Sequence, residues 1–211
     1  MDMLEHETKI RDYNLERLIM LTDGVFAIAI TLLAIELHPP ANRDRTFAGL
    51  MAHAGRNFLA YAMSFVFIAI YWASHRRTFK RFKRADGVLT GISFVLLALV
   101  TLVPFGTKLI AVAGPRGEPL MMYMSLVIAI GVVNALQWGY AAFLGRGILE
   151  GRMGWPLKLL IFLILLIVPS LMASLAVIAN GRATPWVYAP MALSIVGVFW
   201  LRRVIGKKHD H

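Results

Sequence analysis

The chain has 211 residues, of which 58% are hydrophobic and only 16% are charged. Soluble domains contain roughly 45–50% apolar and about 25% charged residues, so a soluble helical protein is excluded. We interpret the chain as an integral membrane protein, long enough for about five to seven spans of roughly 20 residues. The chain contains no cysteine, which excludes disulfides, thiol catalysis and Cys-based metal sites.

Six apolar segments follow one another along the chain, and the first covers residues 18–37. It is too long for the apolar core of a signal peptide and lacks a small-residue cleavage site, so we expect no cleavable signal. Proline, glycine or charged residues separate the segments, as is typical of loops. The segments are too long for barrel strands and do not alternate in polarity, which favours helices. The other five expected helices are residues 52–74, 88–112, 120–144, 156–179 and 186–201.

The net charge of +10 is explained by the expected topology, because most basic residues fall on one side of the membrane. With the N-terminus in the cytoplasm, 16 of the 22 Lys and Arg residues lie on the cytoplasmic side. The positive-inside rule therefore predicts that both termini are cytoplasmic. Since topology explains the excess of basic residues, we expect membrane lipids and not nucleic acid as partners. We expect a cytoplasmic N-terminal segment (1–16), a six-helix transmembrane domain (17–203) and a cytoplasmic tail (204–211).

The first helix carries Arg17 and Asp23 near its start. An Asp at a helix centre costs roughly 2.5–3.5 kcal/mol on insertion scales, so its carboxylate needs a protein or water partner. The two residues are about 9 Å apart along the helix and lie on different faces, so each is expected to pair with another helix or subunit. Asp23 is therefore interpreted as an anchor between helices, with a proton-relay or ion-binding role as the alternative.

Ile28, Thr31 and Ile35 form a stripe on the same helix, within about 60° of one another at 100° per residue. Asp23 lies roughly 110° from the centre of this stripe. Two interpretations remain open from spacing alone: the stripe lines a pathway, or it is ordinary packing. If the stripe faces a central pathway, Asp23 faces a neighbouring helix instead.

Polar residues on other helices offer partners or pathways. Trp72 and His75, near the cytoplasmic end of the second helix, lie at the depth of Asp23, and either N–H is a candidate donor to its carboxylate. Asn134 and Gln137 are one helical turn apart and are expected to line a pathway or to link helices. Glu36 follows Ile35, and a solvated helix end is the simplest account of it.

The sequence contains no Ser/His/Asp arrangement, phosphate-binding glycine loop or cluster of carboxylates. We therefore expect that the protein is not an enzyme and has neither a cofactor nor a resident metal. Two function classes remain: a passive channel, and a proton-coupled transporter that uses Asp23 with His75 as relay. Transporters usually show internal repeats and discontinuous helices near the midplane, so the continuous first helix favours the channel.

The segment from Arg17 to Leu33, with Leu21-Thr22-Asp23 and Gly24-Val25-Phe26-Ala27, resembles the lysosomal-type potassium channel family (transmembrane protein 175). Tyr71-Trp72 to His75, the basic run ending at Arg84-Ala85-Asp86, and Pro104-Phe105 follow in the family's order. The family hallmark is an Arg and, after three intervening residues, Phe-Ser-Asp. Here Leu21 replaces the Phe, and Thr22 replaces the Ser but keeps its hydroxyl.

The resemblance implies a homotetramer of six-helix subunits in the inner (plasma) membrane, with the first helix lining a central pore. It implies that Ile28 forms the constriction, Thr31 a hydroxyl layer and Ile35 the region nearer the outer mouth. The permeating ion would be K⁺, selected weakly and without a carbonyl-lined filter. The residues implied to form a structural hydrogen-bond network are Arg17, Thr22, Asp23, Trp72 and His75.

Overall fold

The structure is a computed structural model, and it describes residues 2–37, 47–114, 116–145, 147–151, 153–179, 181, 192 and 195–199. Every regular element in these ranges is helical, apart from an isolated β-bridge between Phe82 and Leu149. The elements are α1 (Asp2–Ile35), α2 (Phe47–Phe79), α3 (Gly87–Thr101), α4 (Val103–Ala113), α5 (Gly117–Gly139), a π-helical turn η1 (Tyr140–Leu144) and α6 (Trp155–Ala179).

The described residues contain five stretches of helix that are long and apolar enough to cross a membrane. They correspond to the first five segments expected from the sequence, and the all-α membrane fold is confirmed. Of the sixth expected segment, 186–201, only residues 192 and 195–199 are described, and these are helical. The expected tail, 204–211, lies outside the described residues.

Helices α1 and α2 are longer than the apolar segments that predicted them. Helix α1 begins at Asp2, not at residue 18, and α2 continues through Arg76 and Arg77 to Phe79. No proline or glycine interrupts the chain before Gly24, and adding residues to an existing helix is far easier than starting one. Hydropathy marks the part of a helix inside lipid, whereas its ends depend on such breakers.

The third expected span is two helices, α3 and α4, that meet at Leu102. The Leu102 N–H donates to Leu99 O at 3.1 Å, and the helix resumes with Gly106 N–H donating to Leu102 O at 3.0 Å. Pro104 lies in the first turn of α4, where its missing N–H costs nothing. The break between the two helices therefore falls two residues before Pro104.

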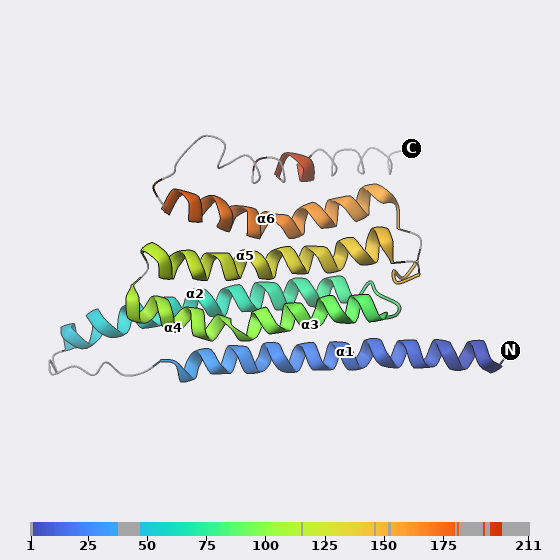
Figure 1. The fold of residues 1–211 in the computed structure, drawn as a ribbon, viewed down its shortest axis with the longest axis horizontal. Coiled ribbons are helices and arrows are strands. Elements are labelled where there is room, and N and C mark those ends of the chain that lie inside the picture. Colours follow the sequence, from blue (N-terminus) through green and yellow to red (C-terminus); the bar gives the residue numbers. More distant parts are fainter. Residues whose placement is uncertain are drawn as a thin grey trace.

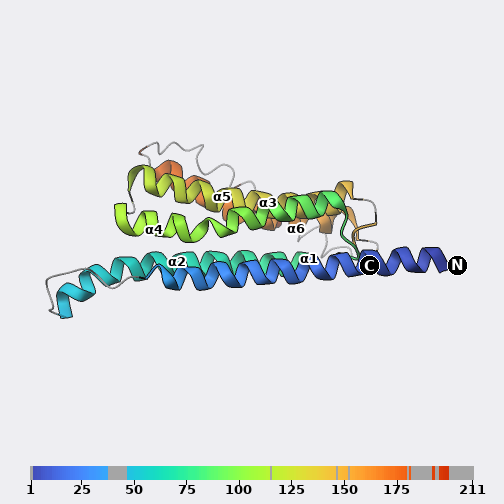
Figure 2. The same ribbon diagram turned by 60° about the horizontal axis from the view of Figure 1, so that its bottom comes forward.

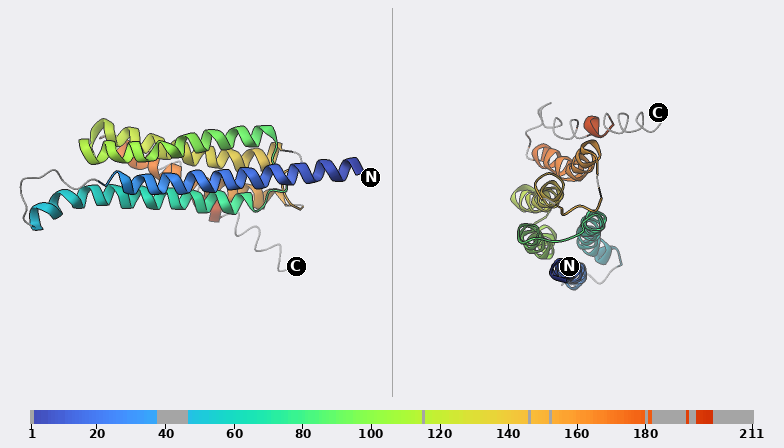
Figure 3. Two further views of the ribbon diagram at one scale, coloured as in Figure 1. Left: turned by 90° about the horizontal axis from the view of Figure 1, so that it is seen from below. Right: turned by 90° about the vertical axis from the view of Figure 1, so that its right-hand side faces the viewer.

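Figure 1 shows the helices as a stack of long rods with α1 along one edge and α6 toward the other, where the short helical segment 195–199 lies outside it. The end-on view in Figure 3 shows α2 and the α3–α4 pair together between α1 and α5. In Figure 2, α1 and α2 run side by side over most of their length, and α1 extends beyond the bundle at its N-terminus. The largest buried cluster lies in this arrangement and includes Phe26 and Leu33 of α1, Ile68 of α2, Leu96 of α3 and Ile130 of α5.

Two connections meet at the end of the bundle that carries the N-terminus (Figure 1). The α2–α3 connection is bonded to the α5–α6 connection, because Lys83 N–H donates to Ile148 O at 2.6 Å and Glu150 N–H donates to Arg81 O at 2.8 Å. Phe82 stacks on Trp138 beside these bonds. This end of the fold is therefore fixed by backbone pairing as well as by helix packing.

Candidate functional site

Helix α1 has one buried face and one face that its own chain leaves uncovered. Leu18, Thr22, Phe26, Ala29 and Leu33, three or four residues apart, are all buried. Ile28 and Ile35, by contrast, are 58% and 67% exposed, and Thr31 is exposed between them. At 100° per residue this stripe lies about 140° from the centre of the buried face. The three stripe residues therefore share the side of α1 that points away from the bundle.

The Thr31 hydroxyl is the polar group of the stripe. Its Oγ1 donates to Ile28 O at 2.8 Å, so the hydrogen is used by the helix itself. The oxygen keeps lone pairs that can accept a hydrogen bond or contact a cation. The exposed face of α1 thus presents an oxygen between two bulky apolar side chains.

The structure brings Asp23 and Trp72 together. The indole Nε1–H of Trp72 donates to Asp23 Oδ1 at 2.7 Å, a short bond from α2 to α1. The guanidinium of Arg76 lies over the same indole ring, 5.3 Å from its centroid. Asp23 is half-buried and points to α2, not along the stripe. Trp72 is one of the two donors, with His75, that were predicted for the Asp23 carboxylate from their depth in the membrane.

His75 and Thr22 are both buried, but other groups surround them. The His75 ring stacks on Phe79 with centroids 3.9 Å apart and lies 6.1 Å from Phe26. Among the described residues its Nε2 has no hydrogen-bond partner. The Thr22 hydroxyl donates to Leu18 O at 2.6 Å within α1. Within the described part of the chain, no hydrogen bond joins either residue to Asp23.

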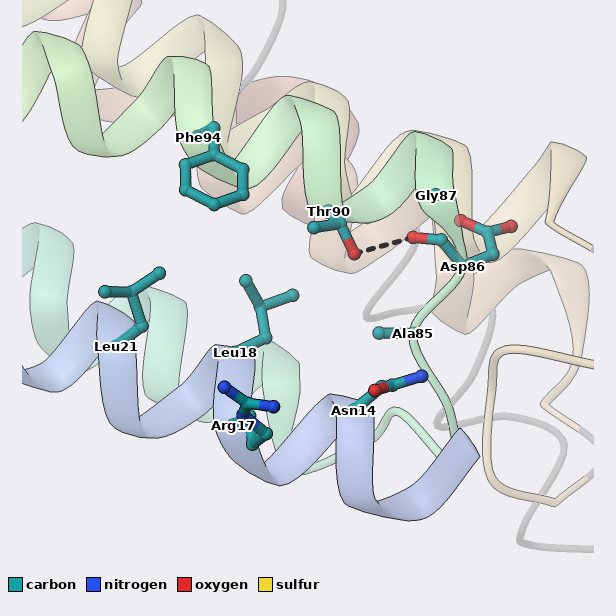
Figure 4. Close-up of a pocket in the computed structure, with 9 residues that line it drawn as sticks. All are labelled: Asn14, Arg17, Leu18, Leu21, Ala85, Asp86, Gly87, Thr90 and Phe94. Carbon is teal, nitrogen blue, oxygen red and sulfur yellow. Dashed lines mark hydrogen bonds between the residues drawn. The ribbon is translucent and has the colours of Figure 1, made fainter. Parts of the chain in front are cut away.

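Arg17 lies at a pocket between α1 and the start of α3. The guanidinium sits 5.6 Å from the ring centroid of Tyr13, and among the described residues no ion pair joins it to Asp23. The pocket has a volume of about 550 Å³. Figure 4 shows Asn14, Arg17 and Leu21 on one side of it and Thr90 and Phe94 on the other. A carboxylate of this pocket, that of Asp86, is already engaged by Leu89 N–H and the Tyr140 hydroxyl.

Further polar contacts link helices elsewhere in the described fold. Asn134 donates to Ser74 Oγ at 3.2 Å, and Gln137 donates to Ser93 Oγ at 2.8 Å, so both residues link α5 to other helices. At the other end, Lys108 Nζ lies 2.9 Å from Glu36 Oε2. The expectation of a simply solvated Glu36 is therefore wrong. The pair joins the residue that follows α1 to the middle of α4, and the packing of these two helices brings them together.

Apolar helices of membrane-spanning length, packed through a buried polar and apolar interior, define an integral membrane protein of the helical-bundle class. Within that class, residues 17–104 match the family model described as "Endosomal/lysosomal potassium channel TMEM175". The fold matches the crystal structure of a lysosomal potassium-selective channel TMEM175 homolog from Chamaesiphon minutus, with a TM-score of 0.66 and 26% identity. That match covers 89% of this chain and 96% of the other. The resemblance to the transmembrane protein 175 family is therefore confirmed.

Relatives known by name are bacterial and animal channels. A potassium channel of Chamaesiphon minutus is 35% identical over 131 residues, which are 59% of this chain and 64% of that protein. A potassium channel of a Chryseobacterium strain is 34% identical over 107 residues, 51% of this chain and 54% of that protein. The human endosomal/lysosomal proton channel TMEM175 is 27% identical over 131 residues, 60% of this chain and 25% of that protein. This chain thus aligns with less than two thirds of each of these proteins, and all three are named as channels, not enzymes.

Proposed function

We propose that this protein is a weakly selective potassium channel of the cell's plasma membrane, assembled from four copies with α1 at the centre. The observation that carries the proposal is the uncovered stripe Ile28, Thr31 and Ile35 on a helix whose opposite face is buried. One α1 cannot enclose a path for ions, whereas several copies can turn this face toward a common axis. The names of the bacterial relatives support K⁺ as the permeating ion.

In the proposed pore, the ring of Ile28 side chains is the constriction. It narrows the path until an ion passes only after losing part of its hydration shell. Potassium loses water more readily than sodium, because its lower charge density binds water more weakly. Apolar side chains supply no dipoles in place of the lost water, so the selectivity is modest and the same ring closes the pore by dewetting. Thr31 adds a layer of hydroxyl oxygens one turn farther along, and Ile35 lies nearer the outer mouth.

Asp23 holds α1 in place in this proposal and does not bind the permeating ion. The Trp72–Asp23 bond ties α1 to α2 on a side of α1 remote from the stripe. Arg17, Thr22 and His75 lie in the same half of α1 and α2 and support the position of the helix. Both termini are proposed to lie in the cytoplasm, where the basic connection between α2 and α3 also belongs.

Substituting Ile28 tests the constriction directly. We expect Ile28→Asn channels reconstituted in planar bilayers to lose most of the K⁺/Na⁺ discrimination of the parent protein, because an amide replaces part of the lost hydration of either ion. The measurement is the reversal potential with K⁺ on one side and Na⁺ on the other. Val66→Asn is the matched control, since Val66 is an exposed apolar residue on α2. An unchanged reversal potential for Ile28→Asn would place the constriction elsewhere.

Proton conduction is the alternative, because the human relative is named a proton channel. In the transporter form of this alternative, Asp23 and His75 relay protons. The contact of His75 with two phenyl rings and the engagement of Asp23 by Trp72 argue against a direct relay between them. The same bilayers decide the matter: K⁺ current at symmetric pH supports the channel, whereas saturable flux driven by a pH gradient supports the alternative.

A further inference from the structure

The Glu36–Lys108 ion pair lies immediately beyond the exposed stripe of α1. Glu36 follows Ile35 directly, and Lys108 reaches it from α4, with 2.9 Å between Nζ and Oε2. The Lys108 side chain is 52% exposed and that of Glu36 is 27% exposed, with Glu36 Oε2 itself buried, so the pair lies at the edge of the fold with Lys108 toward the water. Figure 1 shows the end of α1 and helix α4 at the same end of the bundle, opposite the N-terminus.

Negative charge from two sources, the helix end and Glu36, meets at this end of α1. The last carbonyl groups of a helix have no partner within it and carry the equivalent of about half a negative charge. Glu36 adds a full negative charge at the same place, and Lys108 offsets it. In the proposed assembly four such helix ends surround one mouth of the pore, so the balance between Glu36 and Lys108 is repeated four times around the entering ions.

We propose that Lys108 sets the cation concentration at this mouth of the pore by neutralising Glu36. Lys108 is then a residue that determines conductance without contacting the ion, because it controls how much negative potential the mouth presents. This inference rests on the proposed function, since it requires that α1 lines a cation pathway. It adds a residue of a second helix, α4, that changes the negative potential at the rim of that pathway.

The ionic strength of the solution determines how strongly such a pair acts. Exposed charges influence ions over about 30 Å at 0.01 M salt but only about 3 Å at 1 M. A fixed charge at the rim therefore changes the local cation concentration in dilute salt and has little effect in concentrated salt. A change in the pore's shape, by contrast, alters conductance at every salt concentration.

Single-channel recording of Lys108→Gln tests the proposal. We expect K⁺ conductance to rise roughly two-fold when the solution facing the C-terminal end of α1 is held near 0.01 M KCl, and to match the parent at 1 M. Glu36→Gln leaves Lys108 uncompensated and is expected to lower conductance by a similar factor in dilute salt. The double variant Glu36→Gln/Lys108→Gln restores the charge balance and is expected to return to the parent value.

Two further variants separate charge from structure. Lys108→Arg keeps the charge and is expected to conduct like the parent. Arg116→Gln removes an exposed cation at the start of α5, which Figure 3 shows farther from α1 than the α3–α4 pair, and is expected to raise conductance in dilute salt by less than Lys108→Gln does. The assembly of Lys108→Gln is checked by its elution on gel filtration. If this variant does not assemble, Glu36→Gln, which is expected to lower conductance, and the double variant, which is expected to restore it, still test the proposal.

Each outcome bears on a defined claim. Conductance changes that persist at 1 M KCl, that have the same sign for Lys108→Gln and Glu36→Gln, or that are absent in dilute salt overturn the role of Lys108. Failure of the parent protein to carry any K⁺ current contradicts the proposed channel itself. A conducting parent with no salt-dependent difference among the variants overturns this inference alone.

Discussion

Trp72 places its indole N–H 2.7 Å from the Asp23 carboxylate within the membrane-spanning part of the fold. A carboxylate at this depth has little water to replace a lost partner, so the bond satisfies a group that is otherwise costly to bury. Hydrogen bonds to charged groups are worth about 1.5–3 kcal/mol, roughly twice the neutral kind. The bond is therefore a principal polar link between α1 and α2 in the described fold.

We expect Trp72→Phe to lower the free energy of unfolding by about 1–3 kcal/mol, because phenylalanine keeps an aromatic ring but has no N–H donor. Unfolding in detergent, followed by circular dichroism, measures the loss. The double variant Asp23→Ala/Trp72→Phe supplies the control. If the bond carries the effect, the double variant is about as stable as Asp23→Ala alone. Fully additive losses would show that Trp72 contributes through packing and not through this bond.

The depth of residues on antiparallel helices predicted the Asp23 partner, but only as one of two donors. Trp72 and His75 are three residues apart on one helix, and the sequence alone does not say which ring turns toward α1. Packing decided it: His75 stacks on Phe79 and lies beside Phe26, which leaves Trp72 as the donor. The spacing of Ile28, Thr31 and Ile35 at 100° per residue predicted that they share one face of α1, whereas the role of that face in a pore remains a proposal.

At the scale of elements, α5 and α6 approach closely where Gly131 faces Pro169. A Cβ atom added at Gly131 would lie 2.9 Å from Pro169 Cβ and 2.8 Å from the Tyr71 hydroxyl oxygen. That hydroxyl donates to Val127 O at 2.8 Å and is not free to move. Small residues are common where membrane helices pack tightly, because they let the backbones meet. Gly131 thus fixes the contact of α5 with both α2 and α6.

Gly131→Ala is expected to lower the thermal unfolding midpoint in detergent, at a cost of about 1–3 kcal/mol from overpacking. The alanine methyl must displace either the Pro169 ring or the Tyr71 side chain with its hydrogen bond. Gly91→Ala on α3 is the matched control, since an added Cβ there meets nothing within 4 Å. This control is expected to leave the midpoint unchanged or to raise it slightly. Equal midpoints for the two variants would contradict the tight α5–α6 contact.

The apolar segments predicted the positions of the described membrane helices, because a helix buried in lipid is apolar along its length. They did not locate the start of α1 at Asp2 or the break at Leu102, which depend on helix propagation and on the local effect of Pro104. The Glu36–Lys108 pair was also missed. Its two residues lie 72 positions apart in the sequence, so only the packing of α4 on α1 brings them together.

At the scale of the whole molecule, charge and apolar surface occupy different regions. The connection from α2 to α3 carries exposed basic residues at the end of the bundle where the N-terminus lies (Figure 1). The connection from α5 to α6 lies at the same end, as an even number of crossings between them requires. Large apolar side chains such as Phe58, Val95 and Leu136 are exposed along the sides of the helices, where lipid or other copies of the chain would cover them.

The positive-inside rule therefore predicts that this basic end faces the cytoplasm, and single cysteines test the prediction. The natural chain has no cysteine, so a thiol reagent reacts only with the introduced residue. We expect Lys80→Cys, in the exposed connection after α2, to react with a membrane-impermeant maleimide only from the cytoplasmic side of membrane vesicles. Arg116→Cys, exposed at the opposite end between α4 and α5, is expected to react only from the outside. Since both sites are polar and exposed, differences in labelling report sidedness and not burial. The reverse labelling pattern would place the termini outside and would turn the Glu36–Lys108 end of α1 toward the cytoplasm.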